Sequence, residues 1–93
     1  MIIDSILRYT NRKNIKLIFI TMPAHKSYVK HLDKYQISKT INIADSISKT
    51  NKNVAYYNFL IDTSFHTEDF FDSDHLNEKG AEKLTFKINQ LLH

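Results

Sequence analysis

The stretch Ile15-Lys16-Leu17-Ile18-Phe19-Ile20-Thr21-Met22, followed directly by Pro23, decides the fold class of this chain. It is almost continuously apolar, which is typical of a strand in a parallel sheet that is covered on both faces. Residues 54–61, with the sequence Val-Ala-Tyr-Tyr-Asn-Phe-Leu-Ile, form a second run of this kind. The two runs predict two strands of one sheet.

The residues between these strands have the apolar spacing of helices. In residues 26–50, apolar side chains recur at intervals of three and four, as on one face of a helix. Asp33 followed by Gln36 resembles a capping box, so we expect the helix to restart there. A strand–helix–strand unit implies a right-handed parallel crossover. The predicted fold class is therefore α/β, with helices covering a parallel sheet.

Two further helices are expected outside the strands, which gives the order helix–strand–helix–strand–helix. The first covers residues 1–12, where Ile2, Ile6 and Tyr9 share one face. The last begins after Asn77, which is a suitable N-cap. Its apolar stripe comprises Ala81, Leu84, Ile88, Leu91 and Leu92.

A sheet of two parallel strands leaves both of its edges open, which makes a poor sheet alone. We therefore expect these strands to belong to a larger sheet. Its remainder would come from a missing N-terminal part or from a partner chain, for example in a homodimer. Residues 1–93 are accordingly expected to form a single partial domain.

Composition narrows the function classes. The 93 residues include thirteen basic and ten acidic ones, for a net charge of +3, and no cysteine. The lack of cysteine excludes a disulfide framework, a thiolate metal site and a cysteine nucleophile. The basic residues form no stripe of the kind that binds nucleic acid. No run reaches the roughly 18–20 apolar residues of a membrane span. The start of the sequence lacks a signal-peptide pattern, so as written nothing directs the chain out of the cytoplasm.

The candidate chemistry lies after the strands, because ligands of open parallel sheets bind at the carboxyl ends of the strands. A polar loop expected over residues 62–74 carries Asp72, and His75 follows it. Histidine titrates near neutral pH and suits a general base, which a carboxylate can orient. The three-residue offset lets Asp72 fold back to His75, whereas Asp74 is expected to project elsewhere. The alternative is a capping loop with local hydrogen bonds only.

Two other single residues are informative. His25 follows the first strand and is a candidate for substrate contact, although a connector into the next helix is the alternative. Gly80 is the only glycine and falls in the first turn of the last helix, where glycine costs up to about 1 kcal/mol relative to alanine. We expect that helix to approach a neighbouring backbone closely there.

A metal site is the rival interpretation of the polar loop. Residues that can ligate divalent metals recur there at every third position, and they are His66, Asp69, Asp72 and His75. Phe70 and Phe71 interrupt this pattern and are expected to pack inward, so we favour a polar loop and expect no metal or other cofactor.

The motif Asp72-x-x-His75-Leu76-Asn77-x-x-Gly80, followed by an amphipathic helix, resembles the last sequence block of the SGNH (GDSL-type) hydrolases. The similarity is tight over residues 71–84 and loose over residues 15–92, where the elements resemble the C-terminal part of that flavodoxin-like three-layer fold. The resemblance implies esterase, deacetylase or acyltransferase chemistry on a small acyl ester through a serine acyl-enzyme. His75 would be the general base and then the general acid, and Asp72 would orient it.

The chain departs from the family pattern where the nucleophile is concerned. With no second glycine, it has neither the family's G-D-S-type turn nor its glycine block. The similar stretch Asp4-Ser5-Ile6-Leu7 lacks the glycine and lies on a predicted helix rather than at a strand-to-helix elbow. We therefore expect this chain to supply only the Asp and His and to be inactive alone. The alternative is a non-catalytic interaction module that dimerises through open sheet edges.

Overall fold

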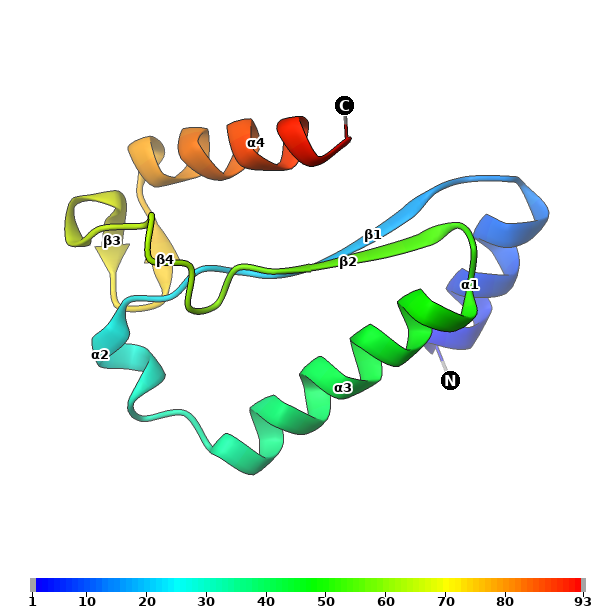
Figure 1. Cartoon of the computed structure of the whole chain (residues 1–93), viewed down its shortest axis with the longest axis horizontal. Coiled ribbons are helices and arrows are strands. Elements are labelled where there is room, and N and C mark those ends of the chain that lie inside the picture. The colour runs from blue at the N-terminus through cyan, green and yellow to red at the C-terminus, as the bar shows by residue number, and fades with distance from the viewer. Residues whose placement is uncertain (1, 93) are drawn as a thin grey trace. The chain divides into compact units, whose positions relative to one another are not determined.

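The computed structural model describes residues 2–92, shown in Figure 1. The chain divides into two compact units. The first comprises Met1–Thr21 and Asp33–Tyr57, and the second comprises Met22–Leu32 and Asn58–His93. The chain therefore passes between the units three times.

The first unit contains a small parallel sheet flanked by helices. Strand β1 (Leu17–Thr21) lies beside β2 (Val54–Asn58), and the unit also holds α1 (Ile2–Arg12) and α3 (Lys34–Thr50) (Figure 1). The hydroxyl groups of Thr21 and Tyr56 lie 2.5 Å apart and join the two strands near their carboxyl ends. The predicted mixed α/β class is confirmed. Within residues 2–92, no third strand joins this sheet.

Both strands are shorter than predicted. β1 lacks the outer residues of the predicted 15–22 strand, and β2 stops at Asn58 rather than at residue 61. The cause lies in Asn58, whose side-chain oxygen accepts a hydrogen bond from the Leu60 N–H at 3.0 Å. This contact turns the backbone away from the extended conformation, as asparagine side chains commonly do.

The helix between the strands breaks where the sequence predicts. The carboxylate of Asp33 accepts hydrogen bonds from the N–H groups of Tyr35 at 2.9 Å and Gln36 at 3.2 Å. This N-cap separates α2 (Lys26–Val29) from α3. The prediction of two helical pieces is therefore confirmed.

The second unit contains α2, a short 3-10 helix η1 (Thr67–Asp69), strands β3 (Phe70–Asp72) and β4 (His75–Leu76), and α4 (Glu78–Leu92). β3 and β4 form an antiparallel hairpin, and α4 packs on η1 and β4. The expected polar loop over residues 62–74 is thus wrong in part. Strands of three and two residues are too short to show the alternation of a strand pattern.

Few apolar side chains are buried. Within residues 2–92, the buried ones are Pro23, Val54, Phe59, Phe65 and Leu84. In the predicted stripe of α4 only Leu84 is buried, while Leu91 keeps half of its surface exposed. The expected inward packing of the two loop aromatics is wrong for Phe71, which is 81% exposed, and Phe70 is half-buried.

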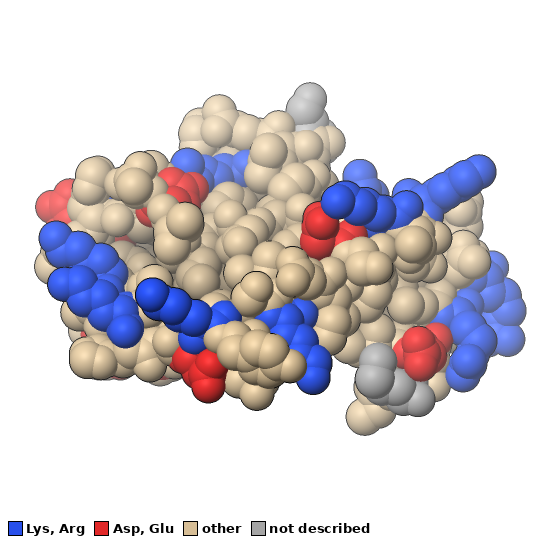
Figure 2. All heavy atoms as spheres, turned by 60° about the horizontal axis from the view of Figure 1, so that its bottom comes forward, with Lys and Arg blue, Asp and Glu red and all other residues tan. Residues whose placement is uncertain are grey.

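The surface carries mixed charge. On the face shown in Figure 2, lysine and arginine side chains occur at several separate places, with acidic side chains near some of them. Among the helices of residues 2–92, none is both long enough and apolar enough to cross a membrane.

Candidate active site

The turn between β3 and β4 brings Asp72 and His75 together. These residues are register partners of the hairpin, and the Nδ1 atom of His75 lies 2.8 Å from Oδ1 of Asp72. The same oxygen accepts a hydrogen bond from the Asp74 N–H at 3.1 Å, which fixes the carboxylate within the turn. Both side chains remain open to solvent, with 68% of His75 and 47% of Asp72 exposed.

The hydrogen bond determines which ring nitrogen of His75 carries the proton. An ionised carboxylate only accepts, so Nδ1–H donates to Asp72 and Nε2 of the neutral ring is left as the acceptor. The hydrogen bond and the charge of Asp72, followed by the charge of Asp74, raise the pKa of His75 above 6.5. In turn, the hydrogen bond from His75 lowers the pKa of Asp72 below 3.8. This is the tautomer that a general base requires.

Asp74 also contacts the ring, contrary to expectation. Its Oδ1 atom lies 3.1 Å from Nδ1 of His75, so it does not project elsewhere. Asp72, Asp74 and His75 are the described residues whose ligand atoms come within 4.8 Å of one another and could hold a metal ion. A metal bound there would have to displace the Nδ1 proton and would compete with the hydrogen-bonded pair.

Asp69 has a different role from the one that its spacing suggested. Its side chain is fully buried, and Oδ2 accepts hydrogen bonds from Lys83 Nζ at 2.5 Å and the His66 N–H at 2.8 Å. Oδ1 has no hydrogen-bond partner among the described residues. The bond from Lys83, followed by that from His66, lowers the pKa of Asp69 against the effect of burial. Asp69 therefore links η1 to α4. The four residues at every third position, His66, Asp69, Asp72 and His75, do not come together as one group of metal ligands.

Asn77 and Gly80 anchor the hairpin to α4. The Asn77 N–H donates to the Asp69 carbonyl oxygen at 3.0 Å, and its side-chain amide donates to the Glu68 carbonyl at 2.7 Å. Its side-chain oxygen accepts from the Gly80 N–H at 2.9 Å, which confirms the predicted N-cap. A Cβ atom at Gly80 would overlap the carbonyl oxygen of Asp69. The predicted close approach of backbones is therefore confirmed.

His25 is the N-cap of α2 and also touches the hairpin. Its Nδ1 atom accepts from the Ser27 N–H at 3.1 Å, and Nε2 lies 3.0 Å from the Thr67 hydroxyl. Its main-chain N–H donates to the carbonyl oxygen of Ser73, within the turn between β3 and β4, at 2.9 Å. The connector interpretation describes its local role, and contact with a substrate stays a prediction.

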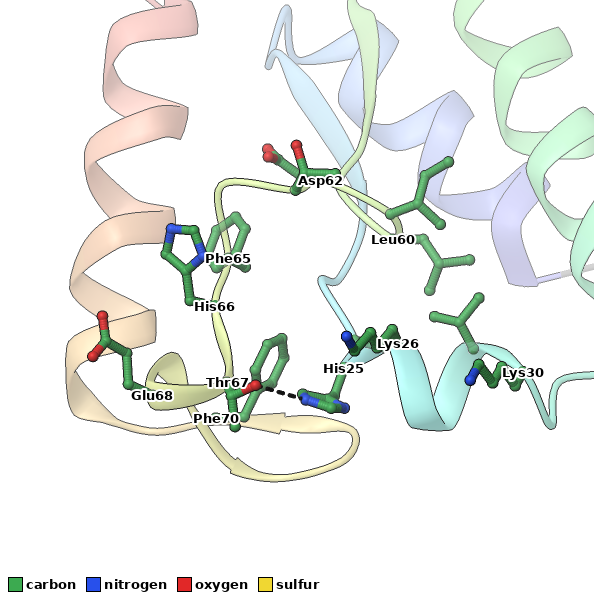
Figure 3. Close-up of a pocket in the computed structure, with 14 residues that line it drawn as sticks. His25, Lys26, Lys30, Leu60, Asp62, Phe65, His66, Thr67, Glu68 and Phe70 are labelled. Carbon is green, nitrogen blue, oxygen red and sulfur yellow. Dashed lines mark hydrogen bonds between the residues drawn. The ribbon is translucent and has the colours of Figure 1, made fainter.

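A hollow of about 920 Å³ opens beside this turn, within the second unit. In Figure 3, α2 with His25, Lys26 and Lys30 borders one side of it, and the segment with Phe65, Thr67 and Phe70 borders the other. Asp72 and His75 do not line the hollow. His25 does line it, and its main-chain N–H is hydrogen-bonded to Ser73, which lies in the turn between Asp72 and His75.

Within residues 2–92, no hydroxyl group is hydrogen-bonded to Nε2 of His75. Ser5 lies on α1, as predicted, and bonds to Arg8. The described residues thus place His75 against the carboxylate of Asp72, with no hydroxyl group bonded to the other ring nitrogen of His75. Sequence reasoning set Asp74 aside and missed Lys83, which does not stand out in the sequence because lysines are frequent throughout.

No protein-family model, curated protein or solved structure matches this chain. The geometry of the site therefore carries the functional argument.

Proposed function

We propose that this chain supplies the Asp–His pair of a serine-dependent hydrolase of the SGNH type. The single observation that carries the proposal is the 2.8 Å contact between Asp72 Oδ1 and His75 Nδ1. It leaves Nε2 as the acceptor, so His75 can take the proton of a serine hydroxyl and later return it to the leaving group. The substrate would be a small acyl ester.

The nucleophile and the oxyanion donors would come from outside residues 1–93. Further strands of a flavodoxin-like three-layer fold would pair with the open edges of β1 and β2. Two observations support this: a sheet of two strands, and few buried apolar residues among those described. The solvent exposure of Asp72 fits the same proposal, because a covering segment would exclude water from Asp72 and His75 and strengthen the hydrogen bond between them.

The first test is to read the DNA upstream of the Met1 codon. An in-frame apolar strand that ends in a G-D-S-type turn would support the proposal. A stop codon and a ribosome-binding site immediately before Met1 would contradict it.

The second test is activity of the protein encoded by the whole reading frame on an activated acetate ester. His75→Ala should abolish serine-dependent turnover, and Asp72→Asn should lower kcat by about 10³–10⁴-fold. Asp74→Asn is the matched control and should stay within a few-fold of the parent. The isolated chain should hydrolyse the ester no faster than its His75→Ala variant, and serine-dependent turnover by the isolated chain would overturn this assignment of roles.

A second candidate function is an interaction module, which the open edges of the β1–β2 sheet favour. Such edges can pair with a second copy of the chain. Gel filtration discriminates between the two: a defined dimer that melts cooperatively supports the module, whereas an aggregating or partly unfolded chain supports the hydrolase fragment.

A further inference from the structure

The hollow beside α2 has an apolar lining. Val29, Leu60, Phe65 and Phe70 line it, together with Ala24. A volume of about 920 Å³ lies in the range of small-molecule sites, which are mostly apolar with a few polar groups that fix orientation.

Two lysines border this lining without an acidic partner. Lys26 and Lys30 both line the hollow (Figure 3), and neither ammonium group is paired with a carboxylate in the described part of the chain. The Lys30 N–H donates to the Lys26 carbonyl oxygen at 3.2 Å, so the two residues are one helical turn apart. Residues at this spacing share a face, so the two charges lie on the same side of α2.

The acids of the hollow are already paired. Asp62 Oδ2 lies 3.3 Å from Lys87 Nζ, and Glu68 Oε1 lies 3.1 Å from Lys79 Nζ. In Figure 3 the Glu68 carboxylate points away from Lys26 and Lys30. The uncompensated charge that borders the hollow is therefore positive.

The two walls are joined by His25. Its ring contacts the Thr67 hydroxyl on the far wall at 3.0 Å, and it stands edge-on to Phe70, with ring centroids 5.7 Å apart. Because both ring nitrogens are engaged, the histidine holds the walls together. A preformed site loses less free energy to ordering when a ligand binds.

We propose that this hollow binds an aliphatic carboxylate. The carboxylate lies at the ammonium groups of Lys26 and Lys30, and the hydrocarbon chain covers Leu60 and Phe65. The proposal goes beyond the hydrolase function: binding requires no serine and no turnover, so either proposal can fail without the other.

The test is a titration of the ¹⁵N-labelled chain with octanoate, followed by NMR. Saturable shifts are expected at the amides of His25, Leu60 and Phe70. The double variant Lys26→Gln/Lys30→Gln should weaken binding about tenfold, since each exposed ion pair contributes modestly. The matched control is Lys34→Gln/Lys39→Gln, which removes the same charge from α3 and should leave binding unchanged.

Two comparisons on the unaltered chain keep the test decisive if the double variant does not fold. Acetate should bind far more weakly than octanoate, because it lacks the apolar chain. Octyltrimethylammonium should not compete with octanoate. Equal binding of that cation, or of acetate, would overturn the proposal. So would self-association of the chain that covers the hollow and blocks octanoate.

Discussion

The backbone of Gly80 packs directly against the carbonyl oxygen of Asp69, and no side chain fits between them. Gly80 does not have a positive φ, so the position needs glycine for space rather than for conformation. This contact lets Asn77 reach the carbonyl groups of residues 68 and 69. The start of α4 is thereby fixed to the residues that precede the Asp72–His75 hairpin.

We expect Gly80→Ala to destabilise the protein, although alanine is ordinarily better than glycine in a helix by about 1 kcal/mol. The added methyl group would press on Asp69 and on Leu76 Cδ2, which would lie 2.9 Å away. Overpacking of this kind costs about 1–3 kcal/mol. Chemical denaturation measures the effect. Ala81→Gly at the neighbouring exposed position is the control and should cost at most about 1 kcal/mol. An increase in stability for Gly80→Ala would show that the helix can shift.

Much of the architecture could be predicted because single residues determine it locally. Asp33 marks the break between α2 and α3, and Asn77 marks the start of α4. The only glycine in the sequence, Gly80, predicted a close approach of two backbones, but the sequence did not indicate that Asp69 is the neighbour. The pairing of Asp69 with Lys83 could not be predicted, because it joins residues 14 positions apart and nothing distinguishes Asp69 from the other loop acids.

Asp72→Asn should lower the pKa of His75. The pKa is raised first by the hydrogen bond and charge of Asp72, and the substitution removes the charge while leaving an oxygen to accept the bond. Titration of the His75 ring by NMR measures the change. Asp74→Asn is the internal comparison and should lower the pKa less, because Asp74 contributes less. An equal or larger effect of Asp74→Asn would mean that Asp74 is the main partner.

Lys83→Met should destabilise the protein more than Asp69→Asn. Removing Lys83 leaves a fully buried carboxylate without its charged partner, which costs about 3–5 kcal/mol for buried pairs. Asp69→Asn removes the charge and keeps an acceptor for the His66 N–H, and Lys83, 27% exposed, can still reach solvent and the Ser64 carbonyl. We expect about 1–3 kcal/mol for that variant. Urea denaturation of both variants tests the order, and the reverse order would show that Asp69 is not ionised in the folded protein.

The second unit should lose stability in acid. The pKa values of Asp69, Asp72 and Asp62 are lowered; for Asp62, burial acts upward but the bonds from Ser64 and Lys87 outweigh it. A carboxyl group whose pKa is lower in the folded state contributes stability above its unfolded pKa of about 4, and that contribution is lost as pH falls through the folded pKa. The melting temperature should therefore fall steadily below about pH 4.

Lys83 accounts for part of this acid sensitivity. Its hydrogen bond is the largest cause of the lowered pKa of Asp69, so Lys83→Met should flatten the dependence of melting temperature on pH in acid. The control is Lys49→Met, which removes an exposed pair with Asp45 on α3 and should leave the slope unchanged. His75 acts in the opposite direction: its raised pKa contributes stability that is complete below about pH 6.5 and is lost as pH rises through the folded value. Circular dichroism melts between acid and neutral pH separate the two effects, and equal acid slopes for Lys83→Met and the parent would refute the role of the buried pair.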